Sequence, residues 1–356
     1  MKKARIVIGA NYGDEGKGTV VAHYTKNSEG SVLNILTNGG SQRGHSILTE
    51  DGSITFQHFG SGTYHGADNF YSRHFILNPI QFVSEYESLI VKPRNIYRDK
   101  DCRWSTPYDV IANLITESEL KRRASCCMGI WNTIKRYNSS PTIQFDHFLM
   151  SEHPEMYLMA VKRYYEGLLT IPDEWKDVWN SIMLVQHFVN DCKFMADKTT
   201  AATLSLLDYD NLIFENGQGL LLCDTGKDTY DTTPSNTGIQ YSLDLLNEFH
   251  DVDVTAHYVT RPYLTRHGDG EIMNGVGGRS SISSSIEQDR TNHYNNNQGM
   301  FRYGLLDIGK LNERIADDCR GVNVELEVTH CDEMDRVGDF RKAFKTVNTY
   351  DSPLIK

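Results

Sequence analysis

The sequence has no apolar run long enough to cross a membrane. A membrane helix needs about 18 consecutive apolar residues, and no stretch of the 356 residues approaches that length. The opening residues, MKKARIVIGA, combine two lysines with a short apolar run but lack the small-residue cleavage site of a signal peptide. We therefore expect a protein without a membrane partner, located in the cytoplasm (the host cytoplasm if the source is a virus).

Positive charge is also scarce. The chain has 36 Lys and Arg against 47 Asp and Glu, a formal net charge of −11. Proteins that hold a nucleic-acid polymer draw much of their affinity from Lys and Arg contacts to phosphates. The charge balance argues against such a partner, although it leaves room for binding a single nucleotide.

Paired cysteine motifs are missing as well. None of the seven cysteines forms a CxxC pair or is spaced with histidines as in a zinc site. We therefore expect reduced thiols. No internal repeat or proline-rich linker divides the chain, which favours one domain over residues 1–356.

Short β-branched runs alternate with longer stretches of helical spacing. This alternation favours an α/β fold with a mainly parallel sheet, in which ligands bind at the carboxyl ends of the strands. Strands are expected at Ala4–Ala10, Ser31–Thr37, Asn211–Glu215, Val252–Thr260 and Asn323–Thr329, and helices at Tyr157–Leu169 and Trp175–Met195. The polar segment Gly275–Gln298 is either a plain loop or a substrate loop.

The first expected strand runs into a glycine-rich turn, IVIGANYGDEGKGTVVAHYT, with a helix expected from Thr19. Backbone amides at a helix N-terminus attract anions, so this context suits phosphate. The turn is related to the P-loop G-x-x-x-x-G-K-[ST] but departs from it at Asn11 and Gly18. Asp14 and Glu15 would repel a nucleotide unless a metal intervenes or one performs proton chemistry. Alternatively, they cap the helix.

A second glycine-rich loop, Asn38–Ser46, follows the second expected strand. It contains three glycines, which allow the backbone to approach a ligand closely. Its histidine, His45, is either a structural residue or part of a site beside the first loop.

The two loops together resemble the adenylosuccinate synthetase family, through Gly13-Asp-Glu-Gly-Lys-Gly18 and Gly39-Gly-x-x-x-Gly-His45. Further segments resemble family motifs in the same order. They are Phe214–Gly219 (F-E-G-A-Q-G), Thr229-Tyr230 with Pro234–Thr237 (T-Y-P-x-V-T-S-S-N-T), Thr260–Gly268 (T-R-x-G), Gly299–Asp307 (G-R-R-R-x-G-W-x-D) and Thr329–Asp332 (T-K-x-D).

The resemblance implies the family's fold, a single large α/β domain with a mainly parallel central sheet and P-loop-like nucleotide-binding loops. It also implies a C–N ligase of purine nucleotide biosynthesis that works in two steps. GTP (or ATP) phosphorylates O6 of a 6-oxopurine nucleotide, and the amine of L-aspartate then displaces that phosphate. Mg²⁺ is the implied cofactor, and a homodimer is the implied assembly.

The resemblance also implies roles for individual residues. Asp14 is the base that takes the N1 proton, His45 is the acid that assists phosphoryl departure, and Lys17 holds phosphate. Mg²⁺ is bound by Asp14 and the carbonyl of Gly44. Triphosphate contacts are Gly13, Glu15, Gly16, Lys17, Gly18, Thr19, Arg302 and the guanine-reading Asp332. Acceptor-nucleotide contacts are Asp14, Gln42, Ser125, Cys126, Gln218, Thr233, His267 and Arg136, the nearest match to an arginine lent to the partner subunit. Aspartate contacts are Asn297, Gln298, Gly299 and Arg302.

The chain departs from the family pattern at three places. Ala124–Ile130 keeps only the Ser125 hydroxyl of the monophosphate-binding G-T-T-G-R-G-I, and Gln42 replaces an asparagine. Met300 replaces the first arginine of T-T-G-R-R-R, which approaches the ribose 2′-hydroxyl in the family. A site without that polar group should accept a deoxynucleotide. This favours the phage branch, which aminates dGMP on the way to 2-aminoadenine. The retained Asp14 argues for IMP, the alternative acceptor.

Two interpretations from other classes are weaker. A P-loop kinase or GTPase predicts Ser or Thr after Lys17 and an Asn-Lys-x-Asp motif, where the chain has Gly18 and Thr-His-Cys-Asp. A non-catalytic relative would explain the positions that depart from the family pattern, but it would not explain the retention of Asp14, Lys17 and His45.

Overall fold

A central sheet of parallel strands organises the protein. The computed structural model describes residues 1–49, 52–121, 125–139, 142–224, 232–289, 292, 294 and 297–351. Within them, nine strands form one sheet in the order β16-β15-β11-β1-β10-β2-β5-β7-β9, and every neighbouring pair is parallel. The strands are β1 (Lys2–Gly9), β2 (Val32–Leu36), β5 (Asp68–Tyr71), β7 (Ile96–Arg98), β9 (Thr200–Ala201), β10 (Asn211–Gly219), β11 (Val252–Thr260), β15 (Asn323–Val328) and β16 (Val347–Thr349). The predicted α/β class with a mainly parallel sheet is confirmed.

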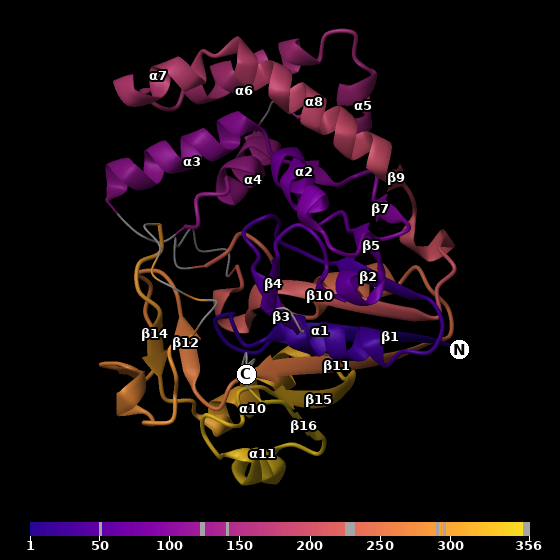
Figure 1. The fold of residues 1–356 in the computed structure, drawn as a ribbon, viewed down its shortest axis with the longest axis vertical. Coiled ribbons are helices and arrows are strands. Elements are labelled where there is room, and N and C mark those ends of the chain that lie inside the picture. Colours follow the sequence, from indigo (N-terminus) through magenta and orange to yellow (C-terminus); the bar gives the residue numbers. More distant parts are fainter. Residues whose placement is uncertain are drawn as a thin grey trace.

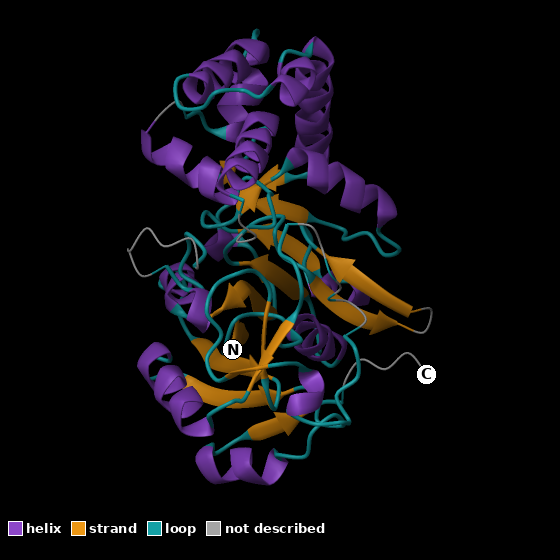
Figure 2. Ribbon diagram, turned by 90° about the vertical axis from the view of Figure 1, so that its left-hand side faces the viewer, coloured by secondary structure: helices purple, strands orange, loops and turns teal. Residues whose placement is uncertain are grey.

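Helices cover the sheet and form a separate layer at one end of the molecule (Figures 1 and 2). The end layer consists of α3 (Pro107–Leu120), α4 (Ile130–Ser139), α5 (Phe145–Met150), α6 (Pro154–Glu166), α7 (Asp173–Trp179) and α8 (Ile182–Lys198). The other α-helices of the described residues are α1 (Lys17–Lys26), α2 (Pro79–Ser88), α9 (Gln240–Leu246), α10 (Ile308–Asp318) and α11 (Val337–Ala343). Short 3-10 helices lie at Ser61–His65, Leu204–Leu206, Leu220–Leu222 and Arg279–Ser281.

Small sheets carry parts of the loops at the strand ends. An antiparallel set of three strands has the order β12-β14-β13, β3 pairs antiparallel with β4, and β6 pairs parallel with β8. Their bounds are β3 (His45–Thr49), β4 (Gly52–Phe56), β6 (Ile76–Leu77), β8 (Arg103–Trp104), β12 (Leu264–Arg266), β13 (Gly275–Val276) and β14 (Arg302–Gly304).

The strands expected from the sequence correspond to β1, β2, β10, β11 and β15, and the first expected helix to α6. The second, Trp175–Met195, is two helices rather than one. Its break lies at Ser181, whose hydroxyl accepts a hydrogen bond from the Leu184 amide at 3.4 Å and so begins α8. A serine that caps a helix start is a stronger local signal than continuous apolar spacing.

Strand β1 lies in the buried centre of the sheet. Ile6, Val7 and Ile8 of β1 have no exposed surface because both faces of the central sheet are covered. Strands buried on both faces are near-continuously apolar, as β1 is. No described helix is both long and apolar enough to span a bilayer. All seven cysteines are described, and none forms a disulfide.

His74 joins the sheet to α9, because its ring stacks on Tyr241 with centroids 3.8 Å apart. Burial and the neighbouring Arg73 charge lower the pKa of His74 to about 4. The unfolded chain therefore takes up this proton first as pH falls below about 6.5, and stability is lost from there toward pH 4. The variant His74→Phe keeps a stacked ring but has no titratable group at this position. Between pH 7 and pH 5, we therefore expect its free energy of unfolding to fall by about 1 kcal/mol less than that of the wild type, after allowance for solvent screening of this half-buried position. Urea unfolding at both pH values measures this. Equal losses in the two proteins would contradict it.

Candidate active site

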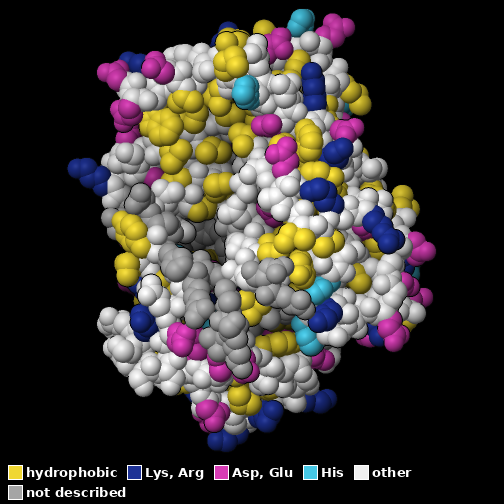
Figure 3. Space-filling model, in the orientation of Figure 1, with side chains coloured by type: hydrophobic (Ala, Val, Ile, Leu, Met, Phe, Trp, Pro, Cys, Tyr) yellow, Lys and Arg dark blue, Asp and Glu magenta, His cyan; other side chains and the backbone are white. Residues whose placement is uncertain are grey.

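A cavity of about 470 Å³ opens at the carboxyl ends of the central strands. Its walls come from the loops after β1, β2 and β11 and from Gln218 near the end of β10. Figure 3 shows a hollow on this face, with hydrophobic side chains gathered above it between α3 and α7. The cavity lies where ligands bind in parallel α/β sheets.

Most of the residues predicted for the site line this cavity. They are Gly13, Asp14, Gly16, Lys17, Gly18, Thr19, Gln42, Gly44, His45, Ser125, Cys126, Gln218, Thr233, His267 and Gln298. Six others do not line it: Glu15, Arg136, Asn297, Gly299, Arg302 and Asp332. Of the family motifs, Ala124, Thr229 and Tyr230 lie outside the described residues.

Glu15 holds its own loop together. Its Oε1 accepts hydrogen bonds from the amides of Asn11 (3.0 Å) and Gly13 (2.8 Å), and its Oε2 lies 3.3 Å from Lys17 Nζ. Both side chains of the Glu15–Lys17 pair are 2% exposed. Helix α1 begins without a side-chain cap, at Gly16. The helix-capping interpretation of Asp14 and Glu15 is therefore wrong. Glu15 instead stabilises its own loop by accepting hydrogen bonds from the loop amides.

Two consecutive carbonyls of this loop are held from neighbouring strands. The Asp14 carbonyl accepts a hydrogen bond from Arg261 Nε at 2.7 Å, directly after β11. The Glu15 carbonyl accepts one from Thr329 Oγ1 at 2.6 Å, directly after β15. Asp14 itself adopts a φ of 61°, a left-handed conformation that is uncommon outside glycine. These contacts fix the backbone that carries Asp14 into the cavity.

Close approach explains the glycine that ends β1. A Cβ at Gly9 would lie 2.6 Å from Glu15 Oε2 and 2.9 Å from Lys17 Nζ. Any side chain there would push the buried ion pair apart, so this position requires glycine.

His45 belongs to a buried network centred on Glu215 of β10. Its Nδ1 lies 2.5 Å from Glu215 Oε1, which also lies 3.1 Å from Arg43 NH2. Ser61 donates to the same carboxylate through its hydroxyl (2.6 Å) and its amide (3.0 Å). Although burial raises it, the Arg43 charge and the bond from His45 lower the pKa of Glu215 to about 2. Glu215 is therefore an anion at neutral pH.

Glu215 also sets the tautomer of His45. Arg43 NH2 lies 3.0 Å from the same Nδ1, but an Nδ1 that lies 2.5 Å from a carboxylate must carry the proton. We therefore assign the arginine N–H to Glu215. Burial and the Arg43 charge lower the pKa of His45 to about 4, so the ring is neutral at pH 7 and its Nε2 is an acceptor that can face a ligand.

Two carboxamides in the cavity wall lack partners among the described residues. Both amide atoms of Gln42 and the Oε1 of Gln218 are buried without a hydrogen bond. Both side chains lie close to Gly39, where a Cβ would be 3.0 Å from Gln42 Nε2 and 3.5 Å from Gln218 Oε1. Buried polar atoms are rarely left unpaired, so this pair is suited to the edge of a polar ligand.

A hydrogen bond joins the segments predicted to bind phosphate and aspartate. Asn297 Nδ2 donates to the Cys126 carbonyl at 3.5 Å. Ser125 Oγ accepts from the Cys127 amide at 3.0 Å, so this hydroxyl is engaged within its own loop.

Arg302 turns toward the backbone rather than into the cavity. Its NH2 donates to the carbonyls of Gly268 and Gly270, both of which line the cavity. Met300, the departure from the family's arginine run, is 66% exposed. Arg302 therefore supports the cavity wall through its NH2 group.

Arg136 is a correction to the sequence prediction. It is fully buried in the helical layer, where Nε and NH2 donate to Asp109 at 2.8 and 2.9 Å and NH1 donates to Tyr157 at 2.7 Å. An arginine saturated in the interior cannot reach a nucleotide in another subunit. Its function is to neutralise the buried Asp109 carboxylate.

Sequence reasoning missed several residues of the cavity wall. Arg261, Asp289 and Glu333 all line it. Arg261 was detectable, since a basic residue directly after a central strand of a parallel sheet lies at the ligand-binding edge. Asp332, by contrast, is exposed, although its neighbour Glu333 reaches the cavity.

The residues implied for Mg²⁺ fit that ion. Asp14 and Gly44 both line the cavity, and Mg²⁺ prefers one or two carboxylates supplemented by carbonyl, phosphate and water oxygens. When bound, the ion would neutralise phosphate charge there.

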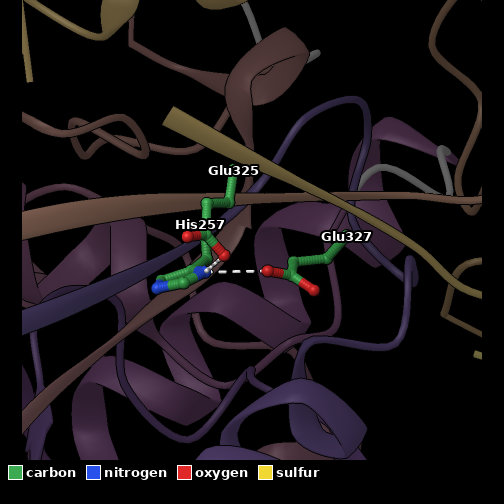
Figure 4. Close-up of side chains that lie close together, drawn as sticks. All are labelled: His257, Glu325 and Glu327. Carbon is green, nitrogen blue, oxygen red and sulfur yellow. Dashed lines mark hydrogen bonds and ion pairs between the residues drawn. The ribbon is translucent and has the colours of Figure 1, made fainter. Parts of the chain in front are cut away.

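A second group with metal-ligand chemistry lies apart from the cavity wall. His257, Glu325 and Glu327 project from β11 and β15, with His257 Nδ1 2.7 Å from Glu327 Oε1 (Figure 4). Glu327 also accepts hydrogen bonds from Tyr24 (2.9 Å) and Tyr350 (2.8 Å). These donors already saturate the carboxylate, so we assign no metal to this group.

Comparison with known proteins shows which family this chain is similar to. A family model described as adenylosuccinate synthetase matches residues 6–343. The adenylosuccinate synthetase of Francisella tularensis subsp. mediasiatica is 24% identical over 296 residues, which cover 76% of this chain and 66% of the relative. That of Finegoldia magna is 24% identical over 277 residues, covering 74% and 64%. The chain spans about two thirds of the length of these relatives.

Two solved structures share the fold. Fully ligated adenylosuccinate synthetase from Plasmodium falciparum has a TM-score of 0.72 at 20% identity, covering 94% of this chain and 78% of that one. The succinoaminodeoxyadenylate synthetase of cyanophage S-2L, bound to dGMP and to dATP as an energy donor, has a TM-score of 0.63 at 14% identity, covering 99% and 91%. With the family model matching nearly the whole chain, the protein belongs to the adenylosuccinate synthetase family.

Proposed function

We propose that this protein is a C–N ligase that phosphorylates O6 of a purine nucleoside monophosphate and replaces the phosphate with L-aspartate. One observation carries the proposal. A single cavity at the carboxyl ends of β1, β2 and β11 brings together Asp14, Lys17 and His45, which provide a candidate base, a cation and a candidate acid.

In the proposed reaction, Asp14 accepts the N1 proton of the 6-oxopurine, which makes O6 a nucleophile. O6 attacks the terminal phosphorus of the triphosphate, and the nucleoside diphosphate leaves. The amine of L-aspartate then attacks C6, and the C6–O bond breaks with release of phosphate. The unpaired carboxamides of Gln42 and Gln218 are suited to hold the purine edge during both steps.

His45 needs a second proton to act as an acid at Nε2. Burial and the Arg43 charge disfavour the charged ring and lower its pKa to about 4. Phosphate oxygens beside the ring would favour the imidazolium and raise that pKa. Lys17 would turn toward the same phosphates from its ion pair with Glu15, which lies 3.3 Å away.

The favoured acceptor is dGMP, which would yield 2-amino-2′-deoxyadenylosuccinate in a phage pathway to 2-aminoadenine. Supporting it, Met300 brings no hydrogen-bonding group to the position of the family's first arginine, and Arg302 is engaged with backbone carbonyls. A relative of the same fold was solved with dGMP and dATP. IMP, the acceptor of the housekeeping family members, is the alternative, and the donor is GTP or ATP.

An end-point assay discriminates between these acceptors. Purified protein is supplied with Mg²⁺, L-aspartate and GTP or ATP, and with IMP, dIMP, GMP or dGMP separately, and products are identified by mass. We expect a succinyl adduct on dGMP at least about tenfold above that on IMP. An adduct on IMP alone would make the protein a compact adenylosuccinate synthetase, and no adduct on any acceptor would refute the ligase proposal.

The remaining proposals follow from the family. The protein would act in the cytoplasm as a homodimer of one catalytic domain over residues 1–356, with Mg²⁺ at Asp14 and Gly44. Light scattering of the purified protein tests the dimer.

A further inference from the structure

Arg261 connects the loop that carries Asp14 to a segment far along the chain. Its guanidinium is 5% exposed and lines the cavity. Nε donates to the Asp14 carbonyl at 2.7 Å, and NH2 donates to Asp289 Oδ2 at 2.7 Å. The two contacts use different nitrogens of one planar group, so a displacement of Asp289 changes the direction in which Nε points.

The network continues beyond Asp289 along the cavity wall. Asp289 Oδ1 accepts a hydrogen bond from the Asn292 amide at 3.1 Å, and Asn292 Oδ1 lies 3.2 Å from His267 Nε2. Asp289, Asn292 and His267 all line the cavity. A ligand that contacts this wall therefore touches residues that are hydrogen-bonded, step by step, to the backbone of Asp14.

The other side of Arg261 is braced by aromatic rings. Its guanidinium carbon lies 5.8 Å from the ring centre of Tyr263 and 5.7 Å from that of Phe301. NH1 donates to the Tyr263 hydroxyl at 3.3 Å, and that hydroxyl donates to Glu333. In addition to this bracing, the hydrogen bonds to Asp289 and to the Asp14 carbonyl set the orientation of the guanidinium.

We propose that Arg261 and Asp289 form a positioning pair, which holds the left-handed backbone of Asp14 and couples it to the wall formed by Asp289, Asn292 and His267. Asp14 would then be placed for proton transfer only when the hydrogen bonds that join Asp289, Asn292 and His267 are formed. The catalytic part of this inference rests on the proposed function, whereas the coupling between the two segments does not.

Hydrogen–deuterium exchange on the full chain tests the coupling without any assay of activity. In Asp289→Asn, we expect exchange in the peptide spanning residues 9–20 to rise by about threefold or more, although Asp289 is remote in sequence. Arg261→Lys keeps the charge but loses the Nε donor, and should raise exchange at least as much. The double variant should exchange no faster than Arg261→Lys alone, because both substitutions break one unit.

The kinetic consequence is a lower kcat with preserved binding. Asp289→Asn should lower kcat by about tenfold while the Kd for the acceptor nucleotide stays within about threefold. Asp146→Asn is the control, since it removes another arginine–aspartate pair, which joins α5 to Arg98 of β7 and does not line the cavity. That variant should leave both the exchange of residues 9–20 and kcat unchanged.

The outcomes separate the two ideas. Unchanged exchange in Asp289→Asn would overturn the coupling, as would an equal rise in Asp146→Asn. A rise in exchange with wild-type kcat would overturn its catalytic part. Full activity of an Asp14 variant would instead remove Asp14 as the base, and would leave the exchange result intact.

Discussion

Asp14→Asn is expected to lower kcat by about a thousandfold, while the acceptor nucleotide binds nearly as in wild type. Asparagine has the size and shape of aspartate but cannot accept the N1 proton, and removal of a positioned general base costs about 10² to 10⁴ in rate. The variant should fold, because asparagine tolerates the left-handed conformation that residue 14 adopts at a φ of 61°. Steady-state kinetics with calorimetric nucleotide binding measures both quantities.

A matched control exists for this substitution. Asp251, at the turn before β11, has a φ of 55° and does not line the cavity. Asp251→Asn should therefore retain wild-type kcat and stability. If Asp14→Asn turns over normally, another group removes the proton, and the assignment of Asp14 is wrong.

Glu215→Gln is expected to damage both folding and catalysis. Glu215 is fully buried, and removing its charge leaves the buried Arg43 guanidinium uncompensated. Breaking a buried pair in this way costs about 3–5 kcal/mol of stability. The glutamine also ceases to fix the proton on His45 Nδ1, and loss of an orienting carboxylate should lower kcat by about a hundredfold. Urea unfolding and kinetics on the remaining folded enzyme separate the two effects.

Glu327→Gln provides the comparison for that experiment. Glu327 is also fully buried and holds a buried histidine, with His257 Nδ1 2.7 Å from its Oε1, but neither residue lines the cavity. This variant should lose stability and keep its kcat. A Glu215→Gln enzyme with the same pattern would show that Glu215 is only structural.

The fold was predictable wherever burial dictates the residue pattern. Strand β11 was expected at Val252–Thr260 and is found there, since its β-branched run ends at the turn that begins with Arg261 and Pro262. The break between α7 and α8 was not expected, because it depends on one side-chain hydrogen bond at Ser181, which apolar spacing does not reveal.

The candidate site was predictable where its residues lie in the glycine-rich loops. Asp14, Lys17 and His45 line the cavity as expected, although their catalytic roles stay predictions. Arg136 could not be placed, because an exposed arginine and one buried against Asp109 look alike in a sequence. Asp289 was equally hidden, since its partner Arg261 lies 28 positions away in the chain.

The hydrogen bonds to the carbonyls of Asp14 and Glu15 also fix the orientation of two peptide dipoles. In a trans peptide the N–H points opposite to the C=O, so fixing these two carbonyls toward Arg261 and Thr329 also fixes the N–H groups of Glu15 and Gly16 in the reverse direction. Water around a free phosphate must reorient as charge moves, whereas these two peptide dipoles are aligned when the chain folds. In the proposed reaction, the loop would therefore need little reorganisation energy when a phosphate binds.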